Sequence, residues 1–130
     1  MTDNSMICAG IDVGKSHLDI ALHPGKARLR VTYDTAGLKA LDAFLQEHDV
    51  SRIGFEASGG YEWRLLAHLR AGKRPAARLQ PAQLRFFAKS RLKRAKNDRL
   101  DAALIALFTA SLEQFHALSK DDGRHDTSKN

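Results

Sequence analysis

Four carboxylates occupy positions from which they could share one site. Asp12 closes an apolar run near the N-terminus, Glu56 closes a second such run, and Asp98 and Asp101 lie three residues apart ahead of an alanine- and leucine-rich segment. Carboxylates brought close together repel one another unless a cation or protons neutralise them, so this group suits a hard divalent ion, Mg2+ first and Mn2+ second. Two such ions, about 3.5–4 Å apart, can activate an attacking oxygen and stabilise a leaving oxygen at a phosphodiester. The four acids therefore predict catalytic metal chemistry beside a nucleic-acid phosphate.

Each acid taken alone also has an ordinary structural explanation. Asp12 could form a turn, Glu56 could make a surface salt bridge, Asp98 could interact with a helix dipole, and Asp101 could be a solvated side chain. The metal-site prediction therefore depends on the four acids occurring together.

The positive charge of the chain is concentrated in one segment. Its formal net charge is +6, and residues 85–99 contain seven basic residues and one acid, so the balance of this segment alone equals that of the whole chain. Such a segment favours a polyanionic partner. The basic residues are Arg85, Lys89, Arg91, Lys93, Arg94, Lys96 and Arg99.

The elements that must position these residues follow from the hydrophobic pattern. Residues 6–13 form an apolar run typical of a buried strand, and residues 17–23 and 28–33 alternate apolar and polar side chains. Three strands in succession predict antiparallel pairing. Asp34 or Thr35 can cap a helix that ends before His48. The further predicted elements are a strand at 51–57, a helix at 61–70 closed by Gly72, a strand at 76–79, a helix beginning at Pro81, and a last helix from the N-cap Asn97 to about Phe115.

The order of these elements predicts an α/β fold, with a mixed five-stranded sheet flanked by helices in an RNase H-like arrangement. If the first and fourth strands are neighbours, Asp12 and Glu56 emerge side by side at their ends. The spacing of three residues places Asp98 and Asp101 on one face of the last helix.

Length and composition indicate one domain. With 130 residues and 43% hydrophobic residues, the chain can form a single core. We expect a domain over residues 1–118, followed by a polar, disordered tail at 119–130. The single cysteine, Cys8, cannot form an internal disulfide, and the N-terminus has neither a signal peptide nor a membrane span, so we expect a cytoplasmic location.

The aromatic and histidine residues suggest no additional site. Trp63, Phe86, Phe87 and Phe108 occur at helical spacing among leucines, which favours core packing over base stacking. The six histidines lack the spacing of zinc ligands.

The segment Gly10–Ser16 (GIDVGKS) allows two nucleotide-binding interpretations. A phosphate loop needs four residues between its first glycine and the Gly-Lys pair, whereas three are present here, and the apolar pattern resumes as a strand where that loop requires a helix. The phosphate-binding hairpin of actin-like ATPases and sugar kinases is also similar. Because those proteins need a second lobe that 130 residues cannot supply, this interpretation is the less favoured alternative.

Four motifs in order resemble one known family. They are GIDVGKSHLDIAL (10–22), FEASGGYE (55–62), QPAQLRFFAKS (80–90) and AKNDRLDAALIA (95–106). Together they resemble the N-terminal DEDD domain of insertion-sequence transposases related to Piv-type DNA invertases, over residues 7–108. Asn97 and Ser58 stand where that family commonly has threonine.

The resemblance implies a RuvC-type RNase H fold whose Asp, Glu, Asp and Asp residues match Asp12, Glu56, Asp98 and Asp101. It implies DNA as partner, in some members a structured guide RNA, and homo-oligomers in full-length proteins. Family members continue into a second domain with a catalytic serine, so we expect this chain to be a truncated form that is not autonomous in recombination, or alternatively a non-catalytic nucleic-acid-binding fragment. The candidate nucleic-acid-binding residues are Lys15, Arg85, Lys89, Arg91, Lys93, Arg94, Lys96 and Arg99.

Overall fold

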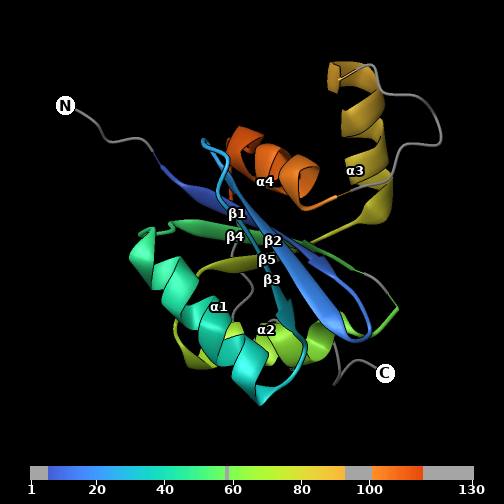
Figure 1. The fold of residues 1–130 in the computed structure, drawn as a ribbon. Helices are drawn as coiled ribbons and strands as arrows, with labels where there is room; N and C mark the ends of the chain where they lie inside the picture. Colours follow the sequence, from blue (N-terminus) through green and yellow to red (C-terminus); the bar gives the residue numbers. More distant parts are fainter. Residues whose placement is uncertain (1–5, 58, 93–100, 116–130) are drawn as a thin grey trace.

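The computed structural model describes residues 6–57, 59–92 and 101–115. It contains a five-stranded mixed sheet in the order β3-β2-β1-β4-β5, with helices on both faces (Figure 1). The predicted α/β architecture is therefore confirmed. In chain order the elements are β1 (Cys8–Val13), β2 (His17–His23), β3 (Arg28–Thr32), α1 (Thr35–Glu47), β4 (Arg52–Glu56), α2 (Glu62–Ala71), β5 (Ala76–Leu79), α3 (Pro81–Phe87), the π-helical turn η1 (Ala88–Leu92) and α4 (Ala102–Ser111).

The strand pairings follow the predicted pattern. Strands β1, β2 and β3 form an antiparallel meander, while β4 pairs with β1 and β5 with β4 in parallel. The bounds of β2 and β5 are those predicted, and the first strand begins two residues later, at Cys8. The first and fourth strands are therefore neighbours, as the predicted site requires.

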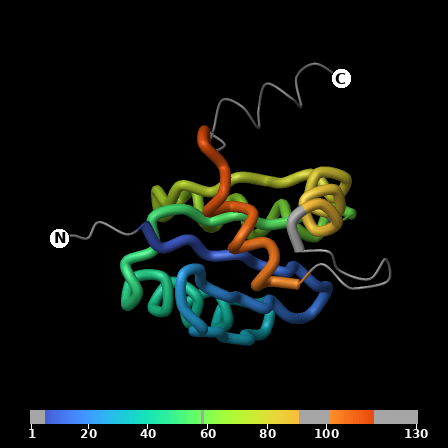
Figure 2. Tube along the Cα trace, turned by 90° about the horizontal axis from the view of Figure 1, so that it is seen from above, coloured from blue at the N-terminus to red at the C-terminus, as the bar shows by residue number. Residues whose placement is uncertain are grey.

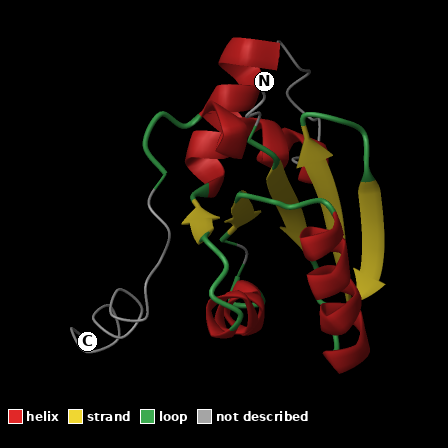
Figure 3. Cartoon of the chain, turned by 90° about the vertical axis from the view of Figure 1, so that its left-hand side faces the viewer, coloured by secondary structure: helices red, strands yellow, loops and turns green. Residues whose placement is uncertain are grey.

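The two faces of the sheet are covered by different helices. Helices α1 and α2 lie on one face and α4 on the other, and α3 stands next to α4 beyond the end of the sheet (Figures 1 and 3). The main core cluster lies on the α1 and α2 side and includes Leu41, Phe55 and Leu66. A smaller cluster, which includes Leu79, Leu84 and Ile105, joins β5 and α3 to α4. Figure 2 shows from above how α4 crosses the central strands.

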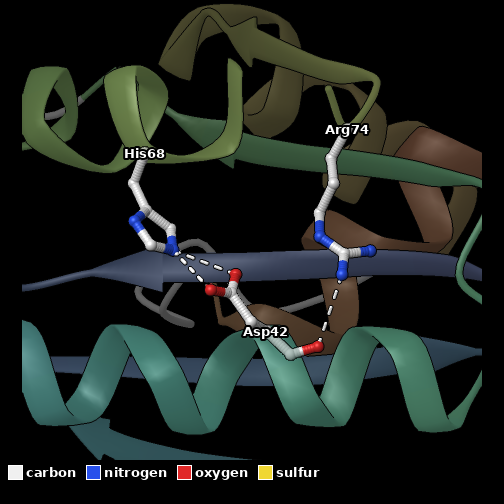
Figure 4. Close-up of polar contacts among 3 residues, drawn as sticks. All are labelled: Asp42, His68 and Arg74. Carbon is white, nitrogen blue, oxygen red and sulfur yellow. Dashed lines mark hydrogen bonds and ion pairs between the residues drawn. The ribbon is translucent and has the colours of Figure 1, made fainter. Parts of the chain in front are cut away.

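Two hydrogen-bonded contacts attach α2 to the rest of the domain. The Tyr33 hydroxyl accepts from the Leu65 amide at 2.8 Å and donates to the Tyr61 carbonyl at 2.6 Å. Across α1 and α2, His68 Nε2 lies 2.9 Å from both carboxylate oxygens of Asp42, while Arg74 donates to the Asp42 carbonyl at 3.4 Å (Figure 4). These contacts fix the helix that follows the Glu56 loop.

Three predictions about the helices need correction. The last helix does not begin after Asn97, because Asp101 itself is the N-cap, and it ends at Ser111 rather than near Phe115. Trp63 and Phe86 are not core residues: they are 45% and 74% exposed. Helical spacing placed them among leucines, but spacing alone does not tell which side of a helix is buried. The Trp63 ring instead lies beside the guanidinium of Arg78 of β5, at 4.7 Å. Phe87 is buried and packs edge-on against Phe108, as predicted.

None of the helices in the described part of the chain has the length and apolar character that crossing a bilayer requires.

Candidate metal centre and nucleic-acid interface

Asp12 and Glu56 stand at the carboxyl ends of two neighbouring parallel strands. The register pairs Ile11 of β1 with Phe55 of β4, and Asp12 and Glu56 are the next residues along. Both are half-buried. Gly10 and Gly54 lie two residues earlier in the same strands, and a Cβ added at either glycine would point at α4. Because side chains alternate along a strand, Asp12 and Glu56 project from that same face.

The two carboxylates are close enough to influence one another electrostatically. Burial raises the pKa of Glu56, the positive charge of Arg85 partly offsets this, and the negative charge of Asp12 raises the pKa further. A divalent cation would favour the charged form of Glu56, as Arg85 does. The pair therefore places two sets of carboxylate oxygens at one end of the sheet, near Arg85.

A third acid, Asp19, stands next to this pair and was not among the predicted site residues. Asp19 of β2 is the register partner of Asp12. Its carboxylate forms a bidentate ion pair with Arg30 of β3, at 2.8 and 3.2 Å, and this hydrogen bond is the main cause of the raised pKa of Arg30. The position of Asp19 opposite Asp12 could have been predicted from the sequence. The tight turn at Gly14–Lys15–Ser16 fixes which residues of the two strands face each other.

Asp101 has a defined local role. Its backbone is extended, and its Oδ1 accepts a hydrogen bond from the Leu104 amide at 3.0 Å, which caps α4. The prediction that Asp101 lies within the first turn of the last helix is therefore wrong, and Asp98 lies outside the described residues. Among residues 6–57, 59–92 and 101–115, no group of three or more His, Cys, Asp or Glu side chains is close enough to hold a metal ion.

The start of α4 is nevertheless held next to the two strand ends. A side chain at Gly10 would collide with the backbone of Ala102 and Ala106. At its other end, α4 is fixed by Arg52, which donates to the carbonyls of Thr109 at 3.4 Å and Leu112 at 2.9 Å. Helix α4, which Asp101 caps, therefore packs closely against β1, the strand that contains Asp12.

Three of the predicted nucleic-acid-binding residues have described, exposed side chains. Lys15 lies in the turn between β1 and β2, and Arg85 and Lys89 lie on α3 and η1. The Gly14 amide donates to the His17 carbonyl at 2.9 Å across that turn, so the segment is a hairpin and not a phosphate loop. The side chains of Arg91, Lys93, Arg94, Lys96 and Arg99 lie outside the described residues.

Comparison with solved structures identifies the fold. Thermus thermophilus RuvC in complex with a Holliday junction substrate matches with a TM-score of 0.59 and 18% identity, over 88% of this chain and 100% of that one. A second Thermus thermophilus RuvC structure matches with a TM-score of 0.52 and 17% identity, over 87% of this chain and 100% of that one. The fold is therefore RuvC-like, within the RNase H-like class. No curated protein matches the sequence.

The sequence also matches a family model. The model describes the DEDD domain of IS110-type transposases, carries the description "Transposase", and matches residues 9–126. That range includes all four predicted acids and the whole of the basic segment. The chain therefore belongs to the DEDD transposase family of the IS110 type.

Proposed function

We propose that this domain binds Mg2+ or Mn2+ through Asp12, Glu56, Asp98 and Asp101 and acts on the phosphodiester backbone of DNA during recombination. The observation that carries the proposal is the placement of Asp12 and Glu56 at adjacent strand ends, on the face that α4 covers. Carboxylates in such a position need a compensating positive charge. Membership of a transposase family supports the same assignment.

The residues present fit a hard divalent cation. All four proposed ligands carry carboxylate oxygens, the donors that Mg2+ and Mn2+ prefer. A bound ion would supply Lewis-acid stabilisation of the oxygens at a scissile phosphodiester. Asp101 would serve two roles, because its Oδ1 caps α4 and a carboxylate has further lone pairs for a cation.

The chain itself would orient the nucleic acid. Arg85 stands close enough to Glu56 to act on its charge, so a phosphate drawn to Arg85 would lie beside the carboxylates. Lys15, in the turn that follows β1, would contact the backbone from a second element. The structure solved with RuvC contains a Holliday junction, which supports branched DNA as the partner. A structured guide RNA would offer the same phosphates to the same basic residues.

Metal-linked stabilisation tests the proposal. We expect Mg2+ or Mn2+ to raise the unfolding midpoint of the wild-type chain in proportion to the logarithm of its concentration, because a ligand that binds only the folded state stabilises it. Asp12→Asn and Glu56→Gln, which keep the side-chain shape, should abolish this effect. Asp101→Asn should also weaken it while leaving the cap intact, since asparagine caps as well as aspartate.

Asp49→Asn is the matched control. Asp49 is exposed and has a φ of 52°, a conformation that asparagine tolerates well. This variant should respond to metal as the wild type does. Equal metal stabilisation in the wild type and in the Asp12 and Glu56 variants would rule out the carboxylate site. The domain would then be a nucleic-acid-binding fragment without metal chemistry.

A further inference from the structure

Phe86 of α3 is a large apolar side chain held in solvent. It is 74% exposed, more than the other exposed large hydrophobic residues Met6, Tyr61 and Trp63. Its neighbours Leu84 and Phe87 point the other way and are buried against α4. The helix is therefore anchored by its inner side, and the position of Phe86 does not contribute to the core.

The surroundings of Phe86 are polar and basic. Gln83, one turn earlier, is exposed, and so are Arg85 beside it and Lys89 in the following turn. The backbone at this point is also fixed, because Ser90 Oγ donates to the Phe86 carbonyl at 2.9 Å, where the α-helix passes into η1. The exposed aromatic ring thus has two exposed basic residues, Arg85 and Lys89, near it on the same helical segment.

The packing of α3 relates this ring to the candidate metal centre. Phe87, the next residue along, packs with Leu104 in the first turn of α4, the helix that Asp101 caps. Helix α3 therefore stands beside the start of α4, at the end of the sheet (Figure 1). A DNA strand whose phosphates reach Arg85 and Lys89 would therefore bring its bases past Phe86. The sequence continues from here into the densest positive charge of the chain.

We propose that Phe86 is a stacking platform for an unpaired base of the DNA bound at the carboxylate site. The inference deepens the proposed function and depends on it. Proteins that hold single-stranded nucleic acid combine a basic groove with exposed aromatic rings, because every base offers a π-face. A paired base in a duplex does not offer that face, so Phe86 selects single-stranded or locally opened DNA.

Self-association through Phe86 is the competing explanation for its exposure. A symmetric contact between two copies would place Arg85 and Lys89 of one chain opposite the same cations of the other, and like charges oppose such a contact. A polyanion, by contrast, complements both the ring and its basic neighbours. Charge complementarity therefore favours a nucleic-acid strand over a second copy of the chain.

The test compares the binding of a short single-stranded DNA and of the duplex with the same sequence. Phe86→Ala should weaken single-strand binding by about 5- to 150-fold, the range for loss of one stacked base, and should change duplex affinity less than about twofold. Phe86→Tyr should retain wild-type affinity, because a tyrosine ring also stacks. A 2-aminopurine in the single strand should be quenched by the wild type and by Phe86→Tyr but not by Phe86→Ala. A ribose version of the strand shows whether the site also accepts RNA.

The outcomes separate this inference from the proposed function. Unfolding midpoints should be equal for all variants, since Phe86 is outside the core, and Lys39→Ala on the exposed side of α1 controls for a surface truncation. If the wild type binds DNA and Phe86→Ala binds both forms equally well, the stacking role is wrong while the proposed function stands. If the wild type binds no DNA, both fail. A concentration-dependent dimer that Phe86→Ala disrupts would overturn the inference in favour of self-association.

Discussion

Gly10 of β1 and Gly54 of β4 are register partners, and together they form the floor on which α4 lies. A Cβ at Gly10 would collide with the backbone of Ala102 and Ala106, and a Cβ at Gly54 would collide with the Thr109 side chain. The pair lets the helix approach the strands closely. Since Asp12 and Glu56 lie two residues further along the same strands, the glycines set the distance between the candidate site and the start of α4.

Gly10→Ala tests this close approach. The new methyl group would meet backbone atoms, which cannot move aside as a flexible side chain can, so α4 must shift. We expect a loss of about 1–3 kcal/mol in unfolding free energy, as for other overpacked cores, measured by urea denaturation. Gly72→Ala is the control, because its Cβ would have ordinary contacts of 3.7–4.0 Å. A Gly10→Ala variant as stable as Gly72→Ala would show that α4 does not need the gap.

The buried carboxylate of Glu62 should make Arg78→Ala strongly destabilising. Glu62 is 1% exposed, and its Oε2 accepts from Arg78 Nε at 2.8 Å, while Oε1 accepts from the Gly60 amide at 3.0 Å. Removing one partner of a buried ion pair costs about 3–5 kcal/mol, and the partial exposure of Arg78 favours the lower end.

The double variant Arg78→Ala with Glu62→Gln separates charge from packing. The glutamine keeps an acceptor for the Gly60 amide and has no charge to bury, so we expect it to recover a large part of the lost unfolding free energy. Urea denaturation of the single and double variants provides the comparison. If the double variant is no more stable than Arg78→Ala, the loss arises instead from the contact of Arg78 with the Trp63 ring, at 4.7 Å.

Tyr33 should make the domain sensitive to alkali. Burial raises the pKa of its hydroxyl, an effect that the Leu65 hydrogen bond and Arg64 partly offset and Glu62 adds to. The folded-state pKa of Tyr33 therefore lies above the unfolded value of about 10. The protonated Tyr33 hydroxyl thus contributes its full stabilisation of the fold below pH 10, and this stabilisation is lost as the pH rises through the folded-state pKa.

The comparison of wild type with Tyr33→Phe measures that contribution. Loss of the two hydroxyl hydrogen bonds should lower the unfolding free energy by about 1–3 kcal/mol at neutral pH, and the difference between the two proteins should shrink above pH 10. The Tyr61→Phe variant retains Tyr33, so its unfolding free energy should fall at alkaline pH by as much as that of the wild type. A difference between wild type and Tyr33→Phe that stays constant with pH would contradict this account.

The basic segment should determine how salt affects nucleic-acid binding. Charge reversal of Lys93, Arg94 and Lys96 should lower DNA affinity and flatten the plot of log affinity against log salt concentration, because fewer counterions are released. Lys39→Glu, which reverses an exposed charge on α1, is the control and should leave the slope near that of the wild type. An unchanged slope in the triple variant would show that this segment is only solvated.

The sequence by itself determined the order of the elements and most of their limits. Several local signals each correspond to an element of the structure. They are the alternation of apolar and polar residues at 17–23 and 28–33, the cap at Asp34 and the proline at the start of α3. The family match, over residues 9–126, includes all four predicted acids. The neighbouring positions of Asp12 and Glu56 were also predictable, since strand ends meet at one edge of a parallel pair.

Only the tertiary structure decided which residues meet across elements. Asp19 lies beside Asp12 through the β1–β2 register, and Gly10 and Gly54 meet α4 from strands that are distant from it in the sequence. Helical spacing predicted a core position for Phe86, but the side of α3 that is buried depends on where α4 lies. The start of α4 is a similar case. Asn97 and Asp101 are both capable caps by residue type, and in the structure Asp101 caps a helix that begins at Ala102, where Ala102 and Ala106 lie against Gly10.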